Sequence, residues 1–328
     1  MSVKPGWFDA FFILRPTLFF PAWTAFLAGY HQGSGGAAGP APYLVWLACA
    51  SGAAFLINQL TDRREDSQNG KLLPLWGDLI SARAVRCELS LLLAVTILGG
   101  IWVGWEISFW LALFFLIAGI FYNFPPLRLK SRPILGIVAC AAGGHILFLI
   151  GARAAGVEFT AAVWHGIPYL FAGAAASLLT HVPDVDGDRE SGVRTFASVY
   201  GLRATATWSA GLVLISLILS LLLADYVLLM AAMVSLPLFI RFYSRSTSEA
   251  AETAVKVAIF CLALTVGITW PAFLLMIALY YPFARWYHRA RLGLEYPTFR
   301  FVKPASAELP DAAVDFKAVV INESTGSV

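Results

Sequence analysis

The segment Ala53-Ala-Phe-Leu-Ile-Asn58-Gln-Leu-Thr-Asp62-Arg-Arg-Glu-Asp66 carries an apolar run directly into a charged motif. The apolar run begins near residue 42, and its length of about twenty residues is enough to cross the hydrocarbon core of a bilayer. Backbone polar groups at that depth must pair within their own segment, so the run is predicted to be a helix. If the helix continues into the motif, Asn58, Asp62 and Asp66 project from one face at the membrane boundary, because they are spaced four residues apart.

The composition of the whole chain excludes a soluble globular domain. Hydrophobic residues make up 59% of the 328 residues and charged residues only 13%, whereas soluble domains carry about a quarter charged residues. The net charge of +3 is small, and we expect no nucleic-acid partner. The cysteines lie in or beside apolar runs without paired spacing, which favours buried small hydrophobes over a metal site or disulfides; they are Cys49, Cys87, Cys140 and Cys261.

Further apolar stretches of similar length predict an all-α, polytopic transmembrane helix bundle of about nine spans. The transmembrane domain is expected to cover residues 1–291, and the polar segment 292–328 is expected to be a disordered C-terminal tail. The spans are predicted near residues 8–30, 42–60, 84–104, 107–123, 134–155, 162–181, 204–223, 225–243 and 253–283.

The positions of the cations predict the topology. Fourteen of the 23 Lys and Arg residues fall in four connections, at 61–86, 128–132, 189–203 and 241–256, while the intervening connections hold only Arg153. By the positive-inside rule, the N-terminus and the four basic connections are cytoplasmic. The last apolar stretch is long for one span and short for two, and we predict one span kinked at Trp270-Pro271. The cations that follow it favour a cytoplasmic end instead, so a tight reversal at the same dipeptide is the alternative.

A faint internal repeat accompanies this topology. Asp62, Asp66 and Gly70 precede Asp184, Asp188 and Gly192 by 122 residues each. Each acidic motif follows the second span of a four-span block, which predicts two parallel pseudo-repeats plus a last span. Both motifs would then face each other across a central cavity that opens to the cytoplasm and to lipid.

The first motif is suited to a divalent cation. Two carboxylates at Asp62 and Asp66 repel each other unless a cation neutralises them, and carboxylate and amide oxygens are ligands that magnesium accepts. Lys71 follows as a candidate partner for phosphate oxygens. A solvated loop balanced by Arg63 and Arg64 explains this segment equally well when it is taken alone.

The second motif, Pro183-Asp184-Val-Asp186-Gly-Asp188-Arg-Glu-Ser-Gly-Val-Arg194, repeats the pattern directly after another span, which ends at His181. It again places two carboxylates four residues apart with a cation beyond them. Gly187 and Gly192 leave open whether the pair sits on a helix or a turn. An EF-hand is excluded because the motif lacks a glutamate at the twelfth position. Ionisable groups at a membrane boundary indicate function.

The third element is Phe121-Tyr122-Asn-Phe-Pro125-Pro126-Leu-Arg128-Leu-Lys130. Taken alone, it is typical of an interfacial stop with an aromatic belt and positive anchors. Beside two acidic, magnesium-competent motifs, Arg128 and Lys130 become candidate partners for diphosphate oxygens.

Together these residues resemble the UbiA-type intramembrane prenyltransferases. The resemblance rests on both acidic motifs, the Tyr-x-x-Pro-Pro-x-Arg-x-Lys element and Arg15-Pro16, in family order from the first span to about residue 201. It implies a bundle of about nine helices around a cavity and a Mg2+ cofactor. It also implies transfer of an isoprenyl chain from a polyprenyl diphosphate to a hydrophobic aromatic or lipid acceptor, as in quinone, tocopherol, chlorophyll or lipid biosynthesis.

Carried over residue by residue, the resemblance assigns metal binding to four aspartates and a catalytic function to the same aspartates and Tyr122. The metal ligands are Asp62, Asp66, Asp184 and Asp188. The diphosphate partners are Asn58, Lys71, Arg128, Lys130 and Arg194, and further cavity residues are Arg15, Asp186 and His181. Arg15 could equally be a snorkelling arginine.

The sequence departs from the family pattern at Asn123, where Ser is common, and after Gly70, where Lys71-Leu-Leu-Pro74 replaces the usual Arg-Pro ending. The residues of the second motif are closer to those of family members of the homogentisate, chlorophyll and archaeal-lipid type than to those of the hydroxybenzoate type. These departures leave the predicted enzyme class unchanged, but they leave the identity of the acceptor open.

Two other functions are consistent with parts of the pattern. An ion-coupled secondary transporter would use the aspartates for coupling, but such sites lie near the membrane midplane in inverted repeats. A lipid-binding scaffold would not need two cation-competent clusters. We therefore expect an integral membrane enzyme, in an inner membrane of bacterial type, with its active-site loops in the cytoplasm.

Overall fold

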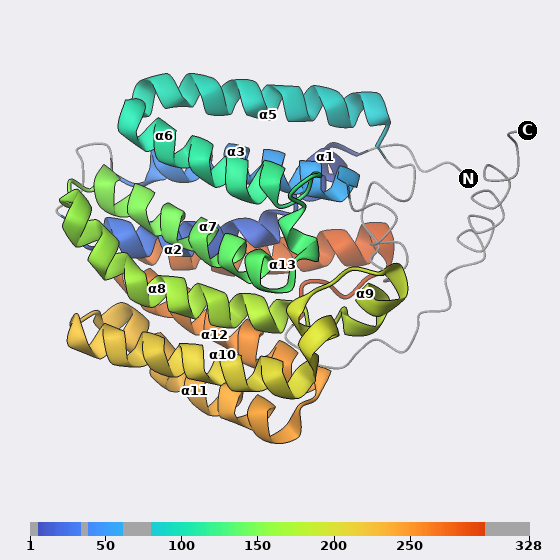
Figure 1. The fold of residues 1–328 in the computed structure, drawn as a ribbon. Helices are drawn as coiled ribbons and strands as arrows, with labels where there is room; N and C mark the ends of the chain where they lie inside the picture. The colour runs from blue at the N-terminus through green and yellow to red at the C-terminus, as the bar shows by residue number, and fades with distance from the viewer. Residues whose placement is uncertain (1–5, 34–38, 62–79, 299–328) are drawn as a thin grey trace, which may run out of the picture.

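The computed structural model describes residues 6–33, 39–61 and 80–298, and all regular structure in these ranges is helical (Figure 1). The polytopic all-helical bundle predicted from the sequence is confirmed. The helices are α1 (Trp7–Ile13), η1 (Pro16–Leu18), α2 (Phe19–Tyr30), α3 (Ala41–Thr61), α5 (Ala82–Val103), α6 (Trp105–Phe114), η3 (Phe115–Phe121), η4 (Leu129–Ser131), α7 (Pro133–Ala154), α8 (Phe159–Thr180), α9 (Val185–Ser191), α10 (Phe196–Leu222), α11 (Tyr226–Arg245), α12 (Ser248–Thr269) and α13 (Pro271–Leu292).

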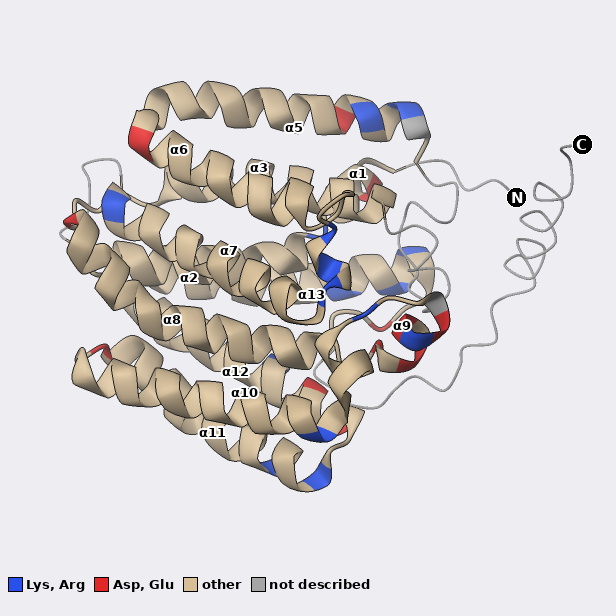
Figure 2. Cartoon of the chain, viewed as in Figure 1, with Lys and Arg blue, Asp and Glu red and all other residues tan. Residues whose placement is uncertain are grey.

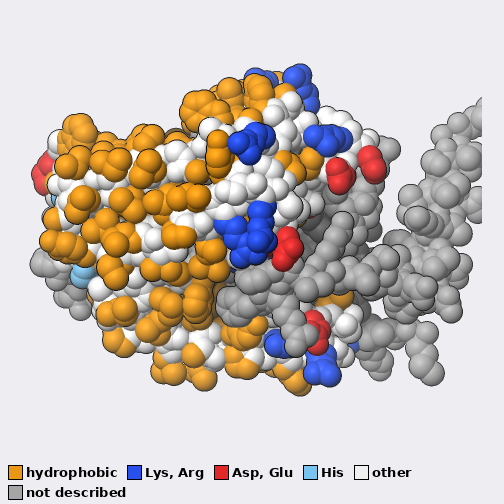
Figure 3. Space-filling model, turned by 90° about the horizontal axis from the view of Figure 1, so that it is seen from below, with side chains coloured by type: hydrophobic (Ala, Val, Ile, Leu, Met, Phe, Trp, Pro, Cys, Tyr) orange, Lys and Arg blue, Asp and Glu red, His pale blue; other side chains and the backbone are white. Residues whose placement is uncertain are grey.

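Seven of the described helices are long and apolar enough to cross a membrane, and the bent pair of α1 and α2 makes an eighth candidate span. Outward-facing side chains on these helices are large and apolar, which suits contact with lipid rather than water. On α5, Ile97 and Ile101 are more than two-thirds exposed. Hydrophobic side chains cover most of the face shown in Figure 3, and the charged side chains gather toward one end.

The first predicted span is not one straight helix. It breaks after α1 at Arg15, whose φ of 54° lies in the left-handed region, and it resumes at Pro16 in η1 with a bend of about 40°. Proline is favoured at the first helical position because it needs no backbone hydrogen bond there. The break places Arg15 at a corner between α1 and α2, rather than within a continuous helix.

Helices α2 and α7 run parallel and cross in backbone contact. A Cβ at Gly29 would lie 2.0 Å from the Phe148 carbonyl oxygen, and a Cβ at Gly151 would lie 1.9 Å from that of Phe26. Only glycine permits so close an approach. Gly29 and Gly151, like Phe26 and Phe148, are 122 residues apart, which is the spacing of the two acidic motifs.

The last apolar stretch forms two helices that reverse at Trp270, so the prediction of one kinked span is wrong. The Trp270 ring lies 5.6 Å from the ring of Tyr30 at the end of α2. From there α13 runs back along α2 and α1, until Arg291 pairs with the buried carboxylate of Asp9. Trp270 and Pro271 allow the reversal because proline at the first helical position can start a new helix without a preceding hydrogen bond.

The end of the bundle that carries α9 also holds most of the described Lys and Arg residues (Figure 2). The opposite end contains Arg153, which is paired with Glu106 through Nη2 and Oε2 at 2.9 Å. This ion pair joins the start of α6 to the end of α7. Residues 293–298 turn back after α13, and the remainder of the predicted tail, 299–328, lies outside the described residues.

Candidate active site

The second acidic motif forms the short helix α9 at one end of the bundle. Asp184 is its N-cap residue, and Gly192 ends it with a φ of 73°. The question of helix or turn is therefore resolved in favour of a helix. One turn of helix separates Asp184 from Asp188, so both carboxylates lie on the same side of α9, whereas Asp186 lies on the other side.

Asp188 is the buried member of this motif, with 8% of its surface exposed. Its Oδ2 accepts a hydrogen bond from the Thr195 hydroxyl at 2.9 Å. Thr195 is itself buried and is the N-cap residue of α10, where its hydroxyl also accepts from the backbone N–H of Ser198. One side chain thus starts α10 and orients the Asp188 carboxylate.

The aromatic and basic element between the two motifs begins in a π-helix. The backbone N–H of Tyr122 donates to the carbonyl of Ile117, five residues back, at 2.9 Å. Such π-turns are rare and occur frequently at functional sites. The chain then turns through cis Pro125-Pro126 and Arg128, whose φ of 36° is unusual for a residue with a side chain. A conformation of this kind costs about 1–3 kcal/mol and persists only where its surroundings hold it.

Lys130 is 8% exposed and lies within the electrostatic reach of Asp188. Burial lowers the pKa of its ammonium to about 8, and the negative charge of Asp188 partly opposes that shift. Its backbone N–H donates to the Tyr122 carbonyl at 3.2 Å, which folds the basic end of this element back onto its aromatic start. The Tyr122 hydroxyl lies beside Cys140 of α7 and within range of the Asp188 charge.

Asn58 connects this element to α3. Its Nδ2 donates to Oδ1 of Asn123 at 2.8 Å, and Asn123 in turn donates to the Gly119 carbonyl at 2.8 Å. Asn123 is 3% exposed. The side chain that departs from the family pattern is therefore a structural link between the π-helix and the helix that leads into the first motif.

Gln59, the next residue along α3, joins that helix to α1. Its Nε2 donates to the Ile13 carbonyl at 2.6 Å, close to the corner formed by Arg15. Gln59 is completely buried. Neither Gln59 nor Thr195 was predicted from the sequence, although a threonine before an apolar helix is a recognisable N-cap signal.

The remaining predicted site residues fall into three groups. His181 and Arg15 are half-buried at the cap of α8 and at the corner after α1, and Arg194 is exposed. The Asp186 side chain is 95% exposed and faces Arg189, so the structure does not bring it together with Asp184 and Asp188. Three predicted residues lie outside the described ranges: Asp62, Asp66 and Lys71.

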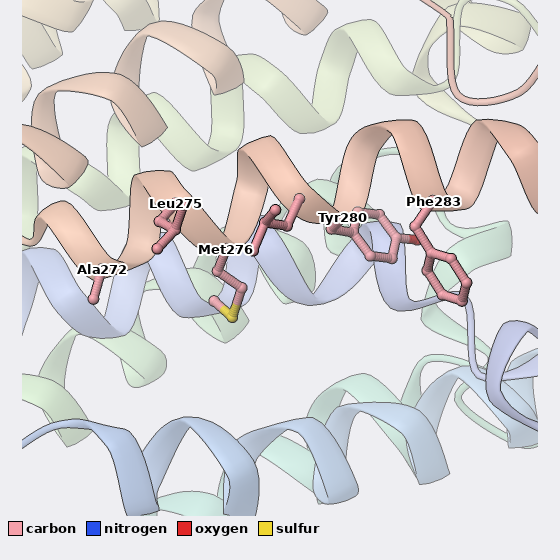
Figure 4. Close-up of a pocket in the computed structure, with 6 residues that line it drawn as sticks. Ala272, Leu275, Met276, Tyr280 and Phe283 are labelled. Atoms are coloured by element: carbon pink, nitrogen blue, oxygen red, sulfur yellow. The ribbon is translucent and has the colours of Figure 1, made fainter.

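Two cavities lined by described residues lie elsewhere on the bundle and are apolar. One, of about 480 Å³, runs along α13 and is lined by Ala272, Leu275, Met276, Leu279, Tyr280 and Phe283 (Figure 4). The other, of about 790 Å³, lies between α5, α6 and Trp46 of α3. Neither has a cationic or carboxylate side chain in its wall. Both cavities therefore suit lipid or hydrocarbon. A diphosphate is better placed at the charged end of the bundle, because burying its charges in an apolar cavity would be costly.

The described acidic residues can be compared with the requirements of a magnesium site. Within the described ranges, no group of three or more His, Cys, Asp or Glu side chains could hold a metal ion. Magnesium in phosphate sites takes one or two carboxylates together with phosphate oxygens and water. The carboxylates of Asp184 and Asp188 are compatible with that requirement, because they offer only oxygen donors, and the Lys130 ammonium near Asp188 is of the right charge for a phosphate.

Comparison with known proteins assigns this geometry to a family. The chain matches the model of the UbiA prenyltransferase family over residues 17–262. It is 30% identical to the lycopene elongase/hydratase of Corynebacterium glutamicum over 203 residues, which cover 56% of this chain and 67% of that protein. It is 28% identical to the chloroplastic homogentisate solanesyltransferase of Arabidopsis thaliana over 206 residues, which cover 56% of this chain and 50% of the relative.

The fold comparison agrees. A UbiA homolog from Archaeoglobus fulgidus, bound to GPP and Mg2+, superposes with a TM-score of 0.60 at 20% identity, covering 79% of this chain and 98% of that one. A digeranylgeranylglyceryl phosphate synthase superposes with a TM-score of 0.60 at 15% identity, covering 79% and 97%. The family match extends over well more than half of the chain. The protein is therefore an integral membrane enzyme of the UbiA prenyltransferase family.

Proposed function

We propose that this enzyme transfers an isoprenyl chain from a polyprenyl diphosphate, bound with Mg2+, to a hydrophobic lipid or quinone-type acceptor. The observation that supports this most directly is that Lys130 and Tyr122, from one segment, converge with Asp188 of α9 at one end of the bundle. The Lys130 ammonium suits the diphosphate, the Asp188 carboxylate suits the metal, and the Tyr122 ring suits the allylic cation. Family membership favours this function over an ion-coupled transporter.

The diphosphate would be held by the basic residues around Asp188. Lys130 supplies a buried ammonium, and the Arg128 guanidinium can bind phosphate oxygens in a bidentate manner. We extend this set, on sequence grounds, to Asn58, Lys71 and Arg194. Because Lys130 is buried, its charge interacts with a bound anion in a low-dielectric environment and is worth more than a charge on the surface.

Asp184 and Asp188 would hold the magnesium, and we propose that Asp62 and Asp66 complete its ligand set. When bound, the ion neutralises the charge of the diphosphate as it departs. Thr195 keeps the Asp188 carboxylate in one orientation through its hydrogen bond. Partners of this kind commonly affect metal affinity by about 10–100-fold when they are removed.

The reaction begins when the allylic C–O bond breaks and its electron pair leaves with the diphosphate. The Tyr122 ring can stabilise the positive charge at the prenyl C1 by about 0.5–2 kcal/mol through its π face. The acceptor then forms the new carbon bond with its own electron pair, and a carboxylate or the diphosphate takes the surplus proton. The apolar helices around Tyr122 exclude water, which would otherwise quench the cation.

The acceptor class is inferred from relatives of different specificity. Their names refer to lycopene, homogentisate and glyceryl phosphate chemistry, which share a hydrophobic or membrane-embedded substrate. We propose an acceptor that enters from the bilayer. We also propose that the charged end of the bundle faces the cytoplasm, and that parallel α2 and α7 begin two pseudo-repeats with equivalent acidic motifs.

The decisive test is transfer by the purified protein in detergent. Labelled geranyl, farnesyl, geranylgeranyl and longer diphosphates would be crossed with carotenoid, homogentisate and glycerophosphate acceptors in the presence of Mg2+. We expect a labelled prenylated product that disappears with EDTA and in Asp188→Asn, while the exposed neighbour variant Asp186→Asn retains activity. Ion flux in proteoliposomes without any prenyl product would contradict the proposal.

A further inference from the structure

One face of α7 is directed into the bundle rather than toward lipid. A Cβ at Gly143 would lie 3.5 Å from the Phe114 ring of α6, while His145 contacts the Gly166 carbonyl of α8 at 2.9 Å. Gly144 lies between these two residues in the sequence, so its side of the helix faces the space between α6 and α8. The lipid side of α7 is the opposite one, where Leu135, nine residues before Gly144, is 45% exposed.

This inward face has open space along its middle. A Cβ added at Gly144 would meet no atom of the neighbouring described helices within 4 Å. Cys140, one turn earlier on the same face, is exposed even though its thiol lies beside Tyr122 and Ser177. A side chain that is exposed yet surrounded by protein faces an internal space.

A buried polar group marks the end of this space nearest Cys140 and Tyr122. Ser177 is 6% exposed, and its hydroxyl has no hydrogen-bonded oxygen or nitrogen among the described residues; the Cys140 thiol beside it is only a weak partner. Other buried serines of the bundle, such as Ser220 and Ser235, bond to carbonyls one turn back. A poorly satisfied buried hydroxyl costs free energy unless a ligand oxygen reaches it. The diphosphate end of a prenyl donor carries such oxygens, whereas the isoprenyl chain that would continue past it needs only the open apolar space beyond.

The space is closed at its inner end. Leu147 continues the face of Cys140 and Gly144 by one further turn and is only 4% exposed in the main core. Gly151 follows, at the backbone contact with α2. The open part of the face therefore begins near the charged end at Cys140 and stops at Leu147, about 10 Å deeper along the helix.

We propose that this face of α7 is the wall along which the donor's isoprenyl chain lies, and that Gly144 and Leu147 set the chain length that the enzyme accepts. The inference rests on the proposed function. The diphosphate at Lys130 fixes one end of the donor, so the chain extends past Tyr122 and Cys140 toward Gly144. A glycine at position 144 leaves room for the chain, and the Leu147 side chain forms its floor.

Two opposite substitutions test the proposal through donor selectivity. Gly144→Phe is expected to lower kcat/KM for geranylgeranyl diphosphate at least tenfold relative to geranyl diphosphate, and Leu147→Ala is expected to shift the ratio toward longer donors. Gly211→Phe is the matched control, because Gly211 is an exposed glycine of α10 with equally open surroundings. Unchanged selectivity in both α7 variants, with transfer intact, would overturn this inference and leave the proposed function standing.

A second measurement does not depend on turnover or on any change at Gly144. A variant with Cys49, Cys87 and Cys261 replaced by Ala retains Cys140 as its one thiol for labelling with N-ethylmaleimide. Geranylgeranyl thiolodiphosphate with Mg2+ should slow labelling at least fivefold, and inorganic diphosphate with Mg2+ should not. A matched variant that retains only the exposed Cys87 should be labelled equally in all conditions.

The outcomes separate the two proposals. Equal labelling of Cys140 with and without the thiolodiphosphate, in protein that transfers prenyl groups, would show that the chain lies elsewhere. Absence of transfer with every donor and acceptor would instead contradict the proposed function. Protection by inorganic diphosphate alone would place Cys140 at the diphosphate rather than at the chain, and would also overturn the inference.

Discussion

Thr195 donates its hydroxyl proton to Oδ2 of Asp188 at 2.9 Å, and both side chains are buried. The two residues belong to different helices, with the glycine that ends α9 between them. Because the same threonine caps α10, the orientation of the proposed magnesium ligand depends on where the next transmembrane helix begins.

Removing this hydrogen bond should weaken metal binding. Thr195→Val is expected to raise the Mg2+ concentration for half-maximal transfer by about 10–100-fold, since a partner of a metal ligand is lost. Thr195→Ser keeps the hydroxyl and should remain within a few-fold of the parent enzyme. A magnesium titration of transfer rate checks this, and equal activation constants for the Val and Ser variants would show that the bond has no such effect.

The buried Lys130 should make donor capture depend on pH. Burial lowers its pKa to about 8, so the donor-free enzyme loses this positive charge as pH rises through that value. The kcat/KM for the donor should then be about tenfold lower at pH 9 than its plateau at low pH. Lys130→Arg stays charged throughout, and its pH profile should be flat over this range. A parallel decline in both enzymes would assign the titration to another group.

The link between Asn58 and Asn123 should support both stability and activity. Asn123→Ala removes a part-buried hydrogen bond from Asn58 and a buried one to the Gly119 carbonyl. The groups that lose their partner are then costly to bury. We expect the free energy of unfolding to fall by about 1–3 kcal/mol, with a lower kcat/KM because α3 is released from the π-helix. Thermal unfolding in detergent measures the first effect. A variant with unchanged stability and activity would contradict the proposed link.

The crossing of α2 and α7 should not accept a side chain. Gly151→Val places its Cβ against the Phe26 carbonyl, where the available distance is 1.9 Å, so the helices must separate. The expected loss is about 1–3 kcal/mol or more. Gly144→Ala, seven residues earlier in the same helix, should be tolerated because the space beside it is open. Comparison of the two unfolding temperatures tests the difference.

The reversal at Trp270 predicts that both ends of the chain lie on the same side of the membrane. Asp9 near the N-terminus pairs with Arg291 at the end of α13. Reporters fused before residue 6 and after residue 298 should therefore share one side, and a reporter inserted at Gly156 should lie on the other. A single kinked span would place the two terminal reporters on opposite sides.

The sequence alone determined the membrane-embedded helical bundle, the family and the motifs around Asp184, Asp188 and Lys130. These features are local, since span length, charge placement and four-residue spacing are properties of short segments. The same local evidence could not distinguish a kink from a reversal at Trp270. A proline after an apolar run permits either one, and the packing of α13 against α1 and α2 decides between them.

Only the tertiary structure joined Thr195 to Asp188, Asn58 to Asn123, and Lys130 to the Asp188 charge. Each pair comes from separate segments, and no periodicity within one segment reports how two segments pack. The structure also separated Asp186 from its neighbours, because helical geometry turns it to the exposed side of α9. The inward direction of Gly144 likewise depends on which helices flank α7, which is a property of the assembled bundle.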